Sequence, residues 1–143
     1  MNREIKFKAI RKDGKGWVYG DYFDTSKSSV CKFLPTIIEN GGMNPIDFHL
    51  VNPKTVCQFT GLLDKNGREI YSNDLVINVD GNRLVVVWIN EWAMFGCMFF
   101  DEFEKYTRGG IKELAESMFW SFPIESERLK VIGNIHEGKE TKP

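Results

Sequence analysis

The order of apolar and polar positions near the start of the chain predicts a β-hairpin. Apolar side chains at positions 5, 7 and 9 alternate with Lys6 and Lys8, and a period of two is typical of a strand with one face in water. The segment 13–16 contains two glycines, which tolerate the backbone conformations of tight turns. The aromatic-rich segment 17–23 is then expected to return as the second strand.

Further strands are predicted along the rest of the chain, at 47–51, 55–62, 75–79, 84–89, 95–100 and 128–135. Segment 36–39 is compatible with either a strand or a short helix. Segment 84–89 is a continuous apolar run rich in valine, which is typical of a strand buried on both faces. Turn sequences at 64–67 and 80–82 separate neighbouring strands, and both contain glycine.

One segment has the periodicity of a helix. Apolar residues at 111, 114, 115, 118, 119 and 122 recur at spacings of three and four, which places them on one helical face. Gly109 and Gly110 precede this segment and Pro123 follows it, so we expect a helix near residues 110–121. The aromatic content of 13%, with 13 Gly and 5 Pro, favours strands elsewhere. The predicted class is mainly β (α+β).

Net charge and cysteine content limit the kinds of partner and site that we expect. The net charge is −1, whereas a dedicated duplex-DNA binder needs a basic surplus to neutralise phosphates. The charge is split, with basic residues concentrated in segment 1–17 and acidic residues in 101–127. These segments are either solvated faces or attract each other, within one chain or between copies. Cys31, Cys57 and Cys97 have no C-x-x-C spacing, so we expect no disulfide framework, no metal site and no cofactor.

A polar cluster in the middle of the chain is the first candidate site, and its residues are Gln58, Thr60, Asp64, Asn66, Arg68 and Asp74. One interpretation is structural, because Asp and Asn side chains in turns cap nearby backbone amides. The other is a small polar binding surface, or a cleft of a small enzyme around Gln58–Arg68. No catalytic residue set is predicted.

The basic segment is the second candidate, for weak binding of single-stranded nucleic acid. Its residues are Arg3, Lys6, Lys8, Arg11, Lys12 and Lys15, and such binding would decline with salt. Five aromatic residues in the second half are expected mainly in the core or in a subunit interface, although exposed rings can also stack on bases or peptides. They are Trp88, Trp92, Phe95, Phe99 and Phe100.

Three stretches of the chain resemble the YopX family of small phage and prophage proteins. They are residues 4–9 with 18–21, residues 55–76, and residues 131–137, which occur in the family's order and span almost the whole chain. The sequence departs from the family pattern at Cys57, where glycine is frequent, and at Ser72-Asn73, where the family often has an acid and glycine. Asparagine tolerates the left-handed conformation that such a glycine adopts, so the turn is expected to survive.

The resemblance implies a fold and a setting. It implies an N-terminal mixed α/β subdomain, residues 1–54, packed on a C-terminal SH3-like barrel, residues 55–137, with a helical insertion near 110–121. Residues 138–143 are polar and are expected to form a flexible tail. The family is associated with oligomeric assembly and has no established activity.

The function expected from the sequence is that of a non-enzymatic, oligomeric interaction module. A phage or host protein is the expected partner, and a weak nucleic-acid-binding module is the alternative. The chain is charged from Arg3 onward and has no apolar stretch long enough to cross a bilayer, so we expect no membrane association and a place in the cytoplasm of the bacterial host.

Overall fold

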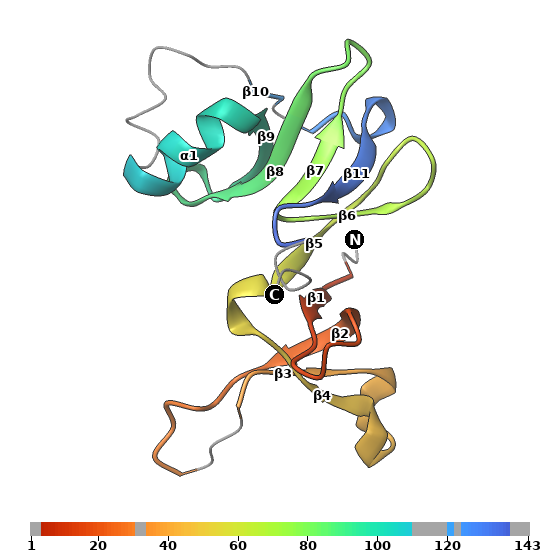
Figure 1. Cartoon of the computed structure of the whole chain (residues 1–143), viewed down its shortest axis with the longest axis vertical. Helices are drawn as coiled ribbons and strands as arrows, with labels where there is room; N and C mark the ends of the chain where they lie inside the picture. The colour runs from red at the N-terminus through yellow and green to blue at the C-terminus, as the bar shows by residue number, and fades with distance from the viewer. Residues whose placement is uncertain (1–3, 31–33, 110–119, 122–123, 138–143) are drawn as a thin grey trace. The chain divides into compact units, whose positions relative to one another are not determined.

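Strands dominate the computed structural model, which describes residues 4–30, 34–109, 120–121 and 124–137. They form two antiparallel sheets, and α1 (Phe100–Gly109) is the α-helix of the described residues (Figure 1). The chain divides into two compact units, of which the first ends at Phe59 and the second begins at Thr60. The sequence places its domain boundary between residues 54 and 55. The prediction of a mainly β chain is confirmed.

The sheet of the first unit is built around the predicted hairpin. Its strands are β1 (Phe7–Ile10), β2 (Trp17–Phe23), β3 (Thr36–Ile38), β4 (Phe48–Leu50) and β5 (Cys57–Leu63), in the order β4-β3-β2-β1-β5. Phe7 pairs with Gly20 and Ile10 with Trp17, which confirms the hairpin. In the ambiguous segment 36–39, residues 36–38 form strand β3. Short 3-10 turns at Asn40–Gly42, Pro45–Asp47 and Pro53–Thr55 connect the later strands.

The core of the first unit lies on one face of this sheet. Ala9, Val18, Ile37 and Val51 are at most 4% exposed and pack together. The alternation along β1 predicts that Lys8 faces water, and this is wrong. Lys8 is only 4% exposed, and its ammonium lies 4.6 Å from the centre of the Trp17 ring, so a cation–π contact takes the place of water.

The second unit contains the second sheet and α1. Strands β7 (Asp74–Ile77), β8 (Arg83–Ile89), β9 (Met94–Phe99), β10 (Trp120–Ser121) and β11 (Lys130–Asn134) have the order β10-β9-β8-β7-β11, while β6 (Glu69–Tyr71) pairs with β5. Two 3-10 turns, Asn90–Trp92 and Ser126–Arg128, lie between strands. In the described part of the chain the strand orders leave both sheets open, ending in β4 and β6 in one and in β10 and β11 in the other.

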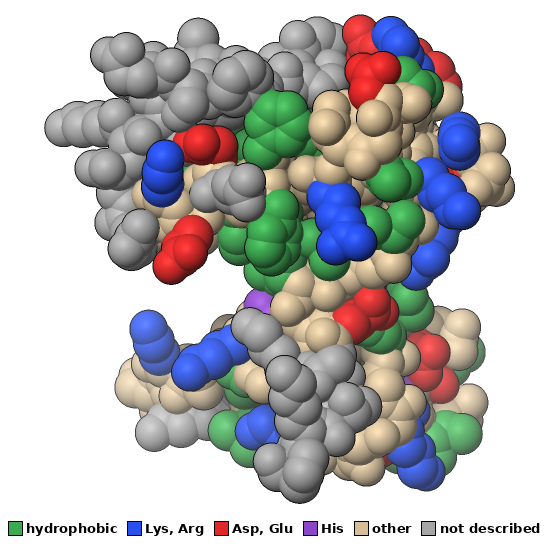
Figure 2. Space-filling view, turned by 45° about the horizontal axis from the view of Figure 1, so that its top comes forward, with side chains coloured by type: hydrophobic (Ala, Val, Ile, Leu, Met, Phe, Trp, Pro, Cys, Tyr) green, Lys and Arg blue, Asp and Glu red, His purple; other side chains and the backbone are tan. Residues whose placement is uncertain are grey.

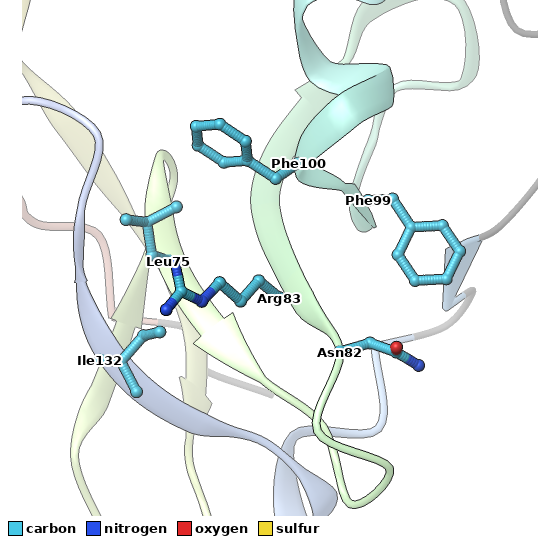
Figure 3. Close-up of a pocket in the computed structure, with 6 residues that line it drawn as sticks. All are labelled: Leu75, Asn82, Arg83, Phe99, Phe100 and Ile132. Atoms are coloured by element: carbon cyan, nitrogen blue, oxygen red, sulfur yellow. The ribbon is translucent and has the colours of Figure 1, made fainter.

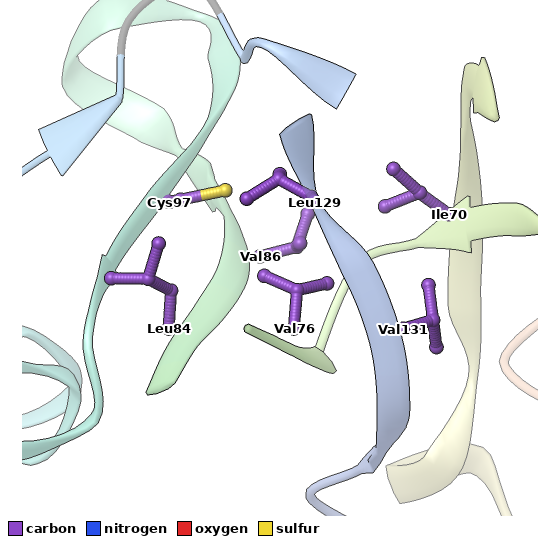
Figure 4. Packing of buried hydrophobic residues seen from close by; sticks show 7 residues of the cluster. All are labelled: Ile70, Val76, Leu84, Val86, Cys97, Leu129 and Val131. Atoms are coloured by element: carbon purple, nitrogen blue, oxygen red, sulfur yellow. The ribbon is translucent and has the colours of Figure 1, made fainter. Parts of the chain in front are cut away.

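Strand β8 is buried on both faces, as its valine-rich sequence predicts. Leu84 and Val86 pack on one side with Val76, Cys97, Leu129 and Val131 (Figure 4). Val85 and Val87 pack on the other side with Ile89 and Met98, where Phe103 and Tyr106 of α1 cover them. Two apolar layers therefore hold the second sheet, and α1 contributes to one of them.

Helix α1 is not among the elements predicted from the sequence. Its aromatic residues recur every three positions, at Phe100, Phe103 and Tyr106. This short series directly follows a strand of similar composition. The glycines at its end favour a helix that begins after them. The helix predicted near 110–121 and the tail 138–143 lie outside the described residues. None of the helices in the described part combines the length and apolar character needed to cross a bilayer.

Candidate functional site

Asp64, in the predicted polar cluster, is a structural anchor of the β5–β6 turn. One of its carboxylate oxygens accepts hydrogen bonds from the backbone amides of Asn66 at 2.8 Å and Arg68 at 2.9 Å. The other accepts from the amide of Val131 on β11, at 2.9 Å. Burial raises the pKa of Asp64, but these three amides outweigh that effect and hold the pKa below its usual range.

Asp74 and Thr60 have comparable backbone contacts. Asp74 is fully buried and accepts hydrogen bonds from the amide of Tyr71 at 2.8 Å and from the side-chain amide of Asn134 at 2.9 Å. The Thr60 hydroxyl donates to the carbonyl of Ile70 at 2.8 Å. Thr60 thus connects β5 to β6, and Asp74 connects the start of β7 to the end of β11.

The remaining residues of the polar cluster do not converge with these buried groups. Asn66 and Arg68 have exposed side chains at the β5–β6 turn, and only their backbone amides contact Asp64. Gln58 is half-buried on β5, where it pairs with Phe7 of β1. The structure brings Thr60, Asp64 and Asp74 into the scaffold, while the others lie at its surface or on another strand.

The basic segment is partly engaged in local contacts. Lys6 lies 3.6 Å from Glu4 and 5.1 Å from the centre of the Phe59 ring. Arg11 forms an ion pair with Asp13. Lys12 and Lys15 have exposed side chains. Arg3 lies outside the described residues.

Histidine and cysteine side chains are engaged separately. His49 Nε2 lies 2.6 Å from a carboxylate oxygen of Glu39, whereas the Cys57 thiol donates to the carbonyl of Thr55 at 3.2 Å. Burial raises the pKa of Cys97 to about 12, so the thiol is not ionised near neutral pH. The described residues contain no group of three or more His, Cys, Asp or Glu side chains arranged to hold a metal ion.

The five singled-out aromatics are divided between the core and the surface. Trp88, Trp92 and Phe100 are 44%, 43% and 52% exposed, whereas Phe95 and Phe99 are half-buried. The Trp88 and Phe95 rings meet edge to face, with their centres 5.0 Å apart. The expectation that these rings lie mainly in the core or in a subunit interface stays a prediction for the three exposed rings.

The first unit also presents an apolar surface, which we call the outer face and define as Tyr19, Phe23, Phe48 and Leu50. These side chains are 41–49% exposed. The pairing of β2 with β3 and of β3 with β4 sets Phe23 and Leu50 opposite Thr36, and Phe48 opposite Ile38. Opposed residues point to the same side of a sheet, so the four side chains share the face opposite the core.

A cavity of about 480 Å³ lies on the second unit, and its described lining residues are Leu75, Asn82, Arg83, Phe99, Phe100 and Ile132. Figure 3 shows Leu75, Arg83, Phe100 and Ile132 grouped on one side of β8, with Asn82 and Phe99 on its other side. At the surface of the molecule, Lys and Arg side chains lie among hydrophobic ones (Figure 2). Sequence reasoning singled out only the two phenylalanines of this cavity, because strand pairing brings the others together.

These features define a class of small, mainly β proteins with two compact units and exposed apolar surfaces. The family model described as YopX protein matches residues 6–140. The chain therefore belongs to the YopX family, which confirms the resemblance. No curated protein sequence matches the chain.

Proposed function

We propose that this protein is a non-enzymatic interaction module that self-assembles through the outer face of its first unit. The outer face carries the proposal, because four large apolar side chains on one sheet face are each more than two-fifths exposed. Contiguous exposed apolar surface of this kind is typical of protein–protein contact sites. A second copy that covers this face would remove it from water.

The polar residues of the middle segment support a role without catalysis. The carboxylates of Asp64 and Asp74 accept hydrogen bonds from backbone and side-chain amides, which is how a scaffold uses buried acids. The Cys97 thiol is buried and protonated. An enzyme acting at Gln58–Arg68 has less support, because the hydrogen bonds that this turn makes to Asp64 come from backbone amides.

Family membership supports the finer structural and biological assignments. We infer an SH3-like barrel for residues 55–137, preceded in the sequence by an N-terminal subdomain of residues 1–54. An antiparallel sheet of five strands in the second unit supports this assignment. The setting that we propose is a phage or prophage protein in the cytoplasm of the bacterial host, with a phage or host protein as a partner. Nucleic-acid binding has less support, because Lys8 is buried and Arg11 is paired with Asp13.

Sedimentation equilibrium over a range of protein concentrations tests self-assembly. The wild type is expected to exceed the monomer mass of 16.5 kDa as its concentration rises. The double variant Phe48→Ser, Leu50→Ser is expected to weaken association about ten-fold or more, because interface energy is concentrated in a few buried apolar residues. Val79→Ser is the control, since Val79 is 59% exposed but lies in the second unit. A strict monomer at every concentration contradicts the proposal.

A further inference from the structure

We propose that the cavity around Arg83 binds an acidic segment of a partner protein in which carboxylate and bulky apolar side chains alternate. This proposal rests on the interaction role proposed above, and it names the chemistry of one partner. It does not depend on self-assembly, because the outer face and the cavity belong to different units. The strand register, the charge of the cavity and its apolar walls each favour this ligand.

Strand register places two basic side chains beside the cavity. Ile77 of β7 pairs with Arg83 of β8 on one side and with Lys130 of β11 on the other. Opposed residues point to the same side of a sheet, so Arg83 and Lys130 flank Ile77 on one face. Ile132 is the extra residue at a register irregularity between Val131 and Gly133; it lines the cavity together with Arg83, and Figure 3 shows it beside that residue.

The cavity has a positive charge that lacks a counterion among the described residues. Arg83 is exposed, and the described part of the chain provides it with no ion pair or hydrogen bond from its side chain. No acidic residue is among the described residues that line the cavity. Two acids elsewhere in this unit are paired with other bases, Glu102 with Lys105 and Glu125 with Arg128. A guanidinium in this position favours a carboxylate, which it can bind through two hydrogen bonds.

The walls of the cavity favour an apolar group next to that carboxylate. Phe100 is 52% exposed and Ile132 is 44% exposed, and in Figure 3 Leu75 lies between Phe100 and the guanidinium of Arg83. A bulky ligand side chain placed against these three residues would remove apolar surface from water on both partners. An extended peptide can supply both groups, because its successive side chains alternate in direction.

Single-stranded nucleic acid fits the same cavity less well. It needs a basic groove that follows several phosphates and a series of rings for stacking. Of the described residues, two basic side chains and one exposed ring, that of Phe100, lie on this face. The small number of cations and rings among the described residues therefore favours a peptide.

Fluorescence anisotropy with a labelled, end-blocked hexapeptide of alternating glutamate and leucine tests the proposal. We expect saturable binding to the wild type within millimolar concentration. Peptides with lysine in place of glutamate, or serine in place of leucine, should bind at least ten-fold more weakly. Arg83→Gln should weaken binding of the Glu–Leu peptide about ten-fold or more, because it removes a charge-assisted hydrogen bond. Arg128→Gln is the matched control and should leave binding unchanged, since Arg128 is exposed and paired with Glu125.

Absence of saturable binding of the Glu–Leu peptide overturns the proposal, and three further results do so as well. One is equal binding of the lysine–leucine peptide, and another is unchanged binding after Arg83→Gln. The third is Arg83-dependent binding of 3-phenylpropionate or of oligothymidylate that is as tight as that of the Glu–Leu peptide, which would assign the cavity to a small acid or to nucleic acid. The same titration on Phe48→Ser, Leu50→Ser should give unchanged peptide affinity. A monomeric protein that still binds the peptide contradicts only self-assembly, whereas an oligomer that does not bind it contradicts only this inference.

Discussion

At the scale of single residues, Asp64 shows how one side chain can join distant parts of a unit. Its carboxylate connects the β5–β6 turn to Val131, which is 67 positions away in the sequence. Because all three donors are backbone amides, any replacement that cannot accept all three bonds leaves a buried amide without a partner. The cost of such a loss is larger when the acceptor is charged.

We therefore expect Asp64→Asn to lower the free energy of unfolding by about 2 kcal/mol, the range for a lost hydrogen bond to a charged group. Asparagine has an NH2 group in place of one carboxylate oxygen, so a donor would face one of the three backbone N–H donors. Urea denaturation with a fixed m-value measures the change. Asp80→Asn is the matched control, because Asp80 is exposed in the β7–β8 turn, and it should change the free energy by less than about 0.5 kcal/mol. Equal effects of the two substitutions would show that Asp64 is not an anchor.

The pH dependence of stability follows from the same carboxylate. The pKa of Asp64 is lowered in the folded state, so the unfolded chain binds its proton more tightly than the folded chain does. The stabilisation is complete above the unfolded pKa of about 3.9 and is lost as the pH falls through the lower folded value. The stability difference between wild type and Asp64→Asn should therefore shrink below about pH 4. A difference that is constant from neutral to acid pH, measured by urea unfolding, would contradict this.

Only part of this arrangement could be predicted from the sequence. The Asp-x-Asn-Gly sequence at 64–67 indicates a turn in which an aspartate caps nearby amides, and the contacts with Asn66 and Arg68 are of that kind. The contact with Val131 has no local signal, because it depends on how β11 returns to the turn. The cavity at Arg83 is hidden for the same reason, since its residues come from four strands, the β7–β8 turn and the start of α1.

At the scale of elements, the hairpins could be predicted and α1 could not. The continuous apolar run of β8 predicts a strand wherever that strand lies in a sheet. Alternation predicts β1, even though Lys8 is buried. In α1, aromatic residues recur every three positions within an acidic segment. The packing of α1 on Val85 and Val87 decides its conformation. Tertiary contacts thus override the preference of aromatic residues for strands.

The pairing of β2 with β3 depends on the absence of a side chain at Gly20. A Cβ there would collide with the backbone carbonyl of Ile38 on β3. Gly20→Ala should therefore lower the free energy of unfolding by about 2–4 kcal/mol, or unfold the first unit, because backbone must shift to admit the methyl group.

Gly14→Ala is the control for this element. Gly14 has a φ of 81°, but none of the described atoms lies within 4 Å of a Cβ built on it. Gly14→Ala should lower the free energy of unfolding by only about 1 kcal/mol, from backbone strain. Circular dichroism during urea unfolding measures both variants. A Gly20→Ala protein as stable as Gly14→Ala would show that β3 can move away from β2 at little cost.

At the scale of the whole molecule, the two features that suggest association differ in their physical origin. The outer face is apolar, whereas the basic segment 1–17 and the acidic segment 101–127 carry opposite net charges. Charge attraction between exposed groups is screened by salt over about 10 Å at 0.1 M and about 3 Å at 1 M. Burial of apolar surface is not weakened in this way.

Salt therefore separates the two origins of self-assembly. If the outer face holds copies together, the association constant from sedimentation should be unchanged or higher at about 1 M NaCl than at about 0.1 M. Phe48→Ser, Leu50→Ser should abolish most association at both concentrations, because it removes the apolar contribution. Replacement of the exposed Lys12 and Lys15 by glutamine should have little effect. A different result would be an oligomer that dissociates at high salt and is weakened by the Lys12 and Lys15 replacements but not by Phe48→Ser, Leu50→Ser. Such an oligomer would be held by attraction between the basic and acidic segments.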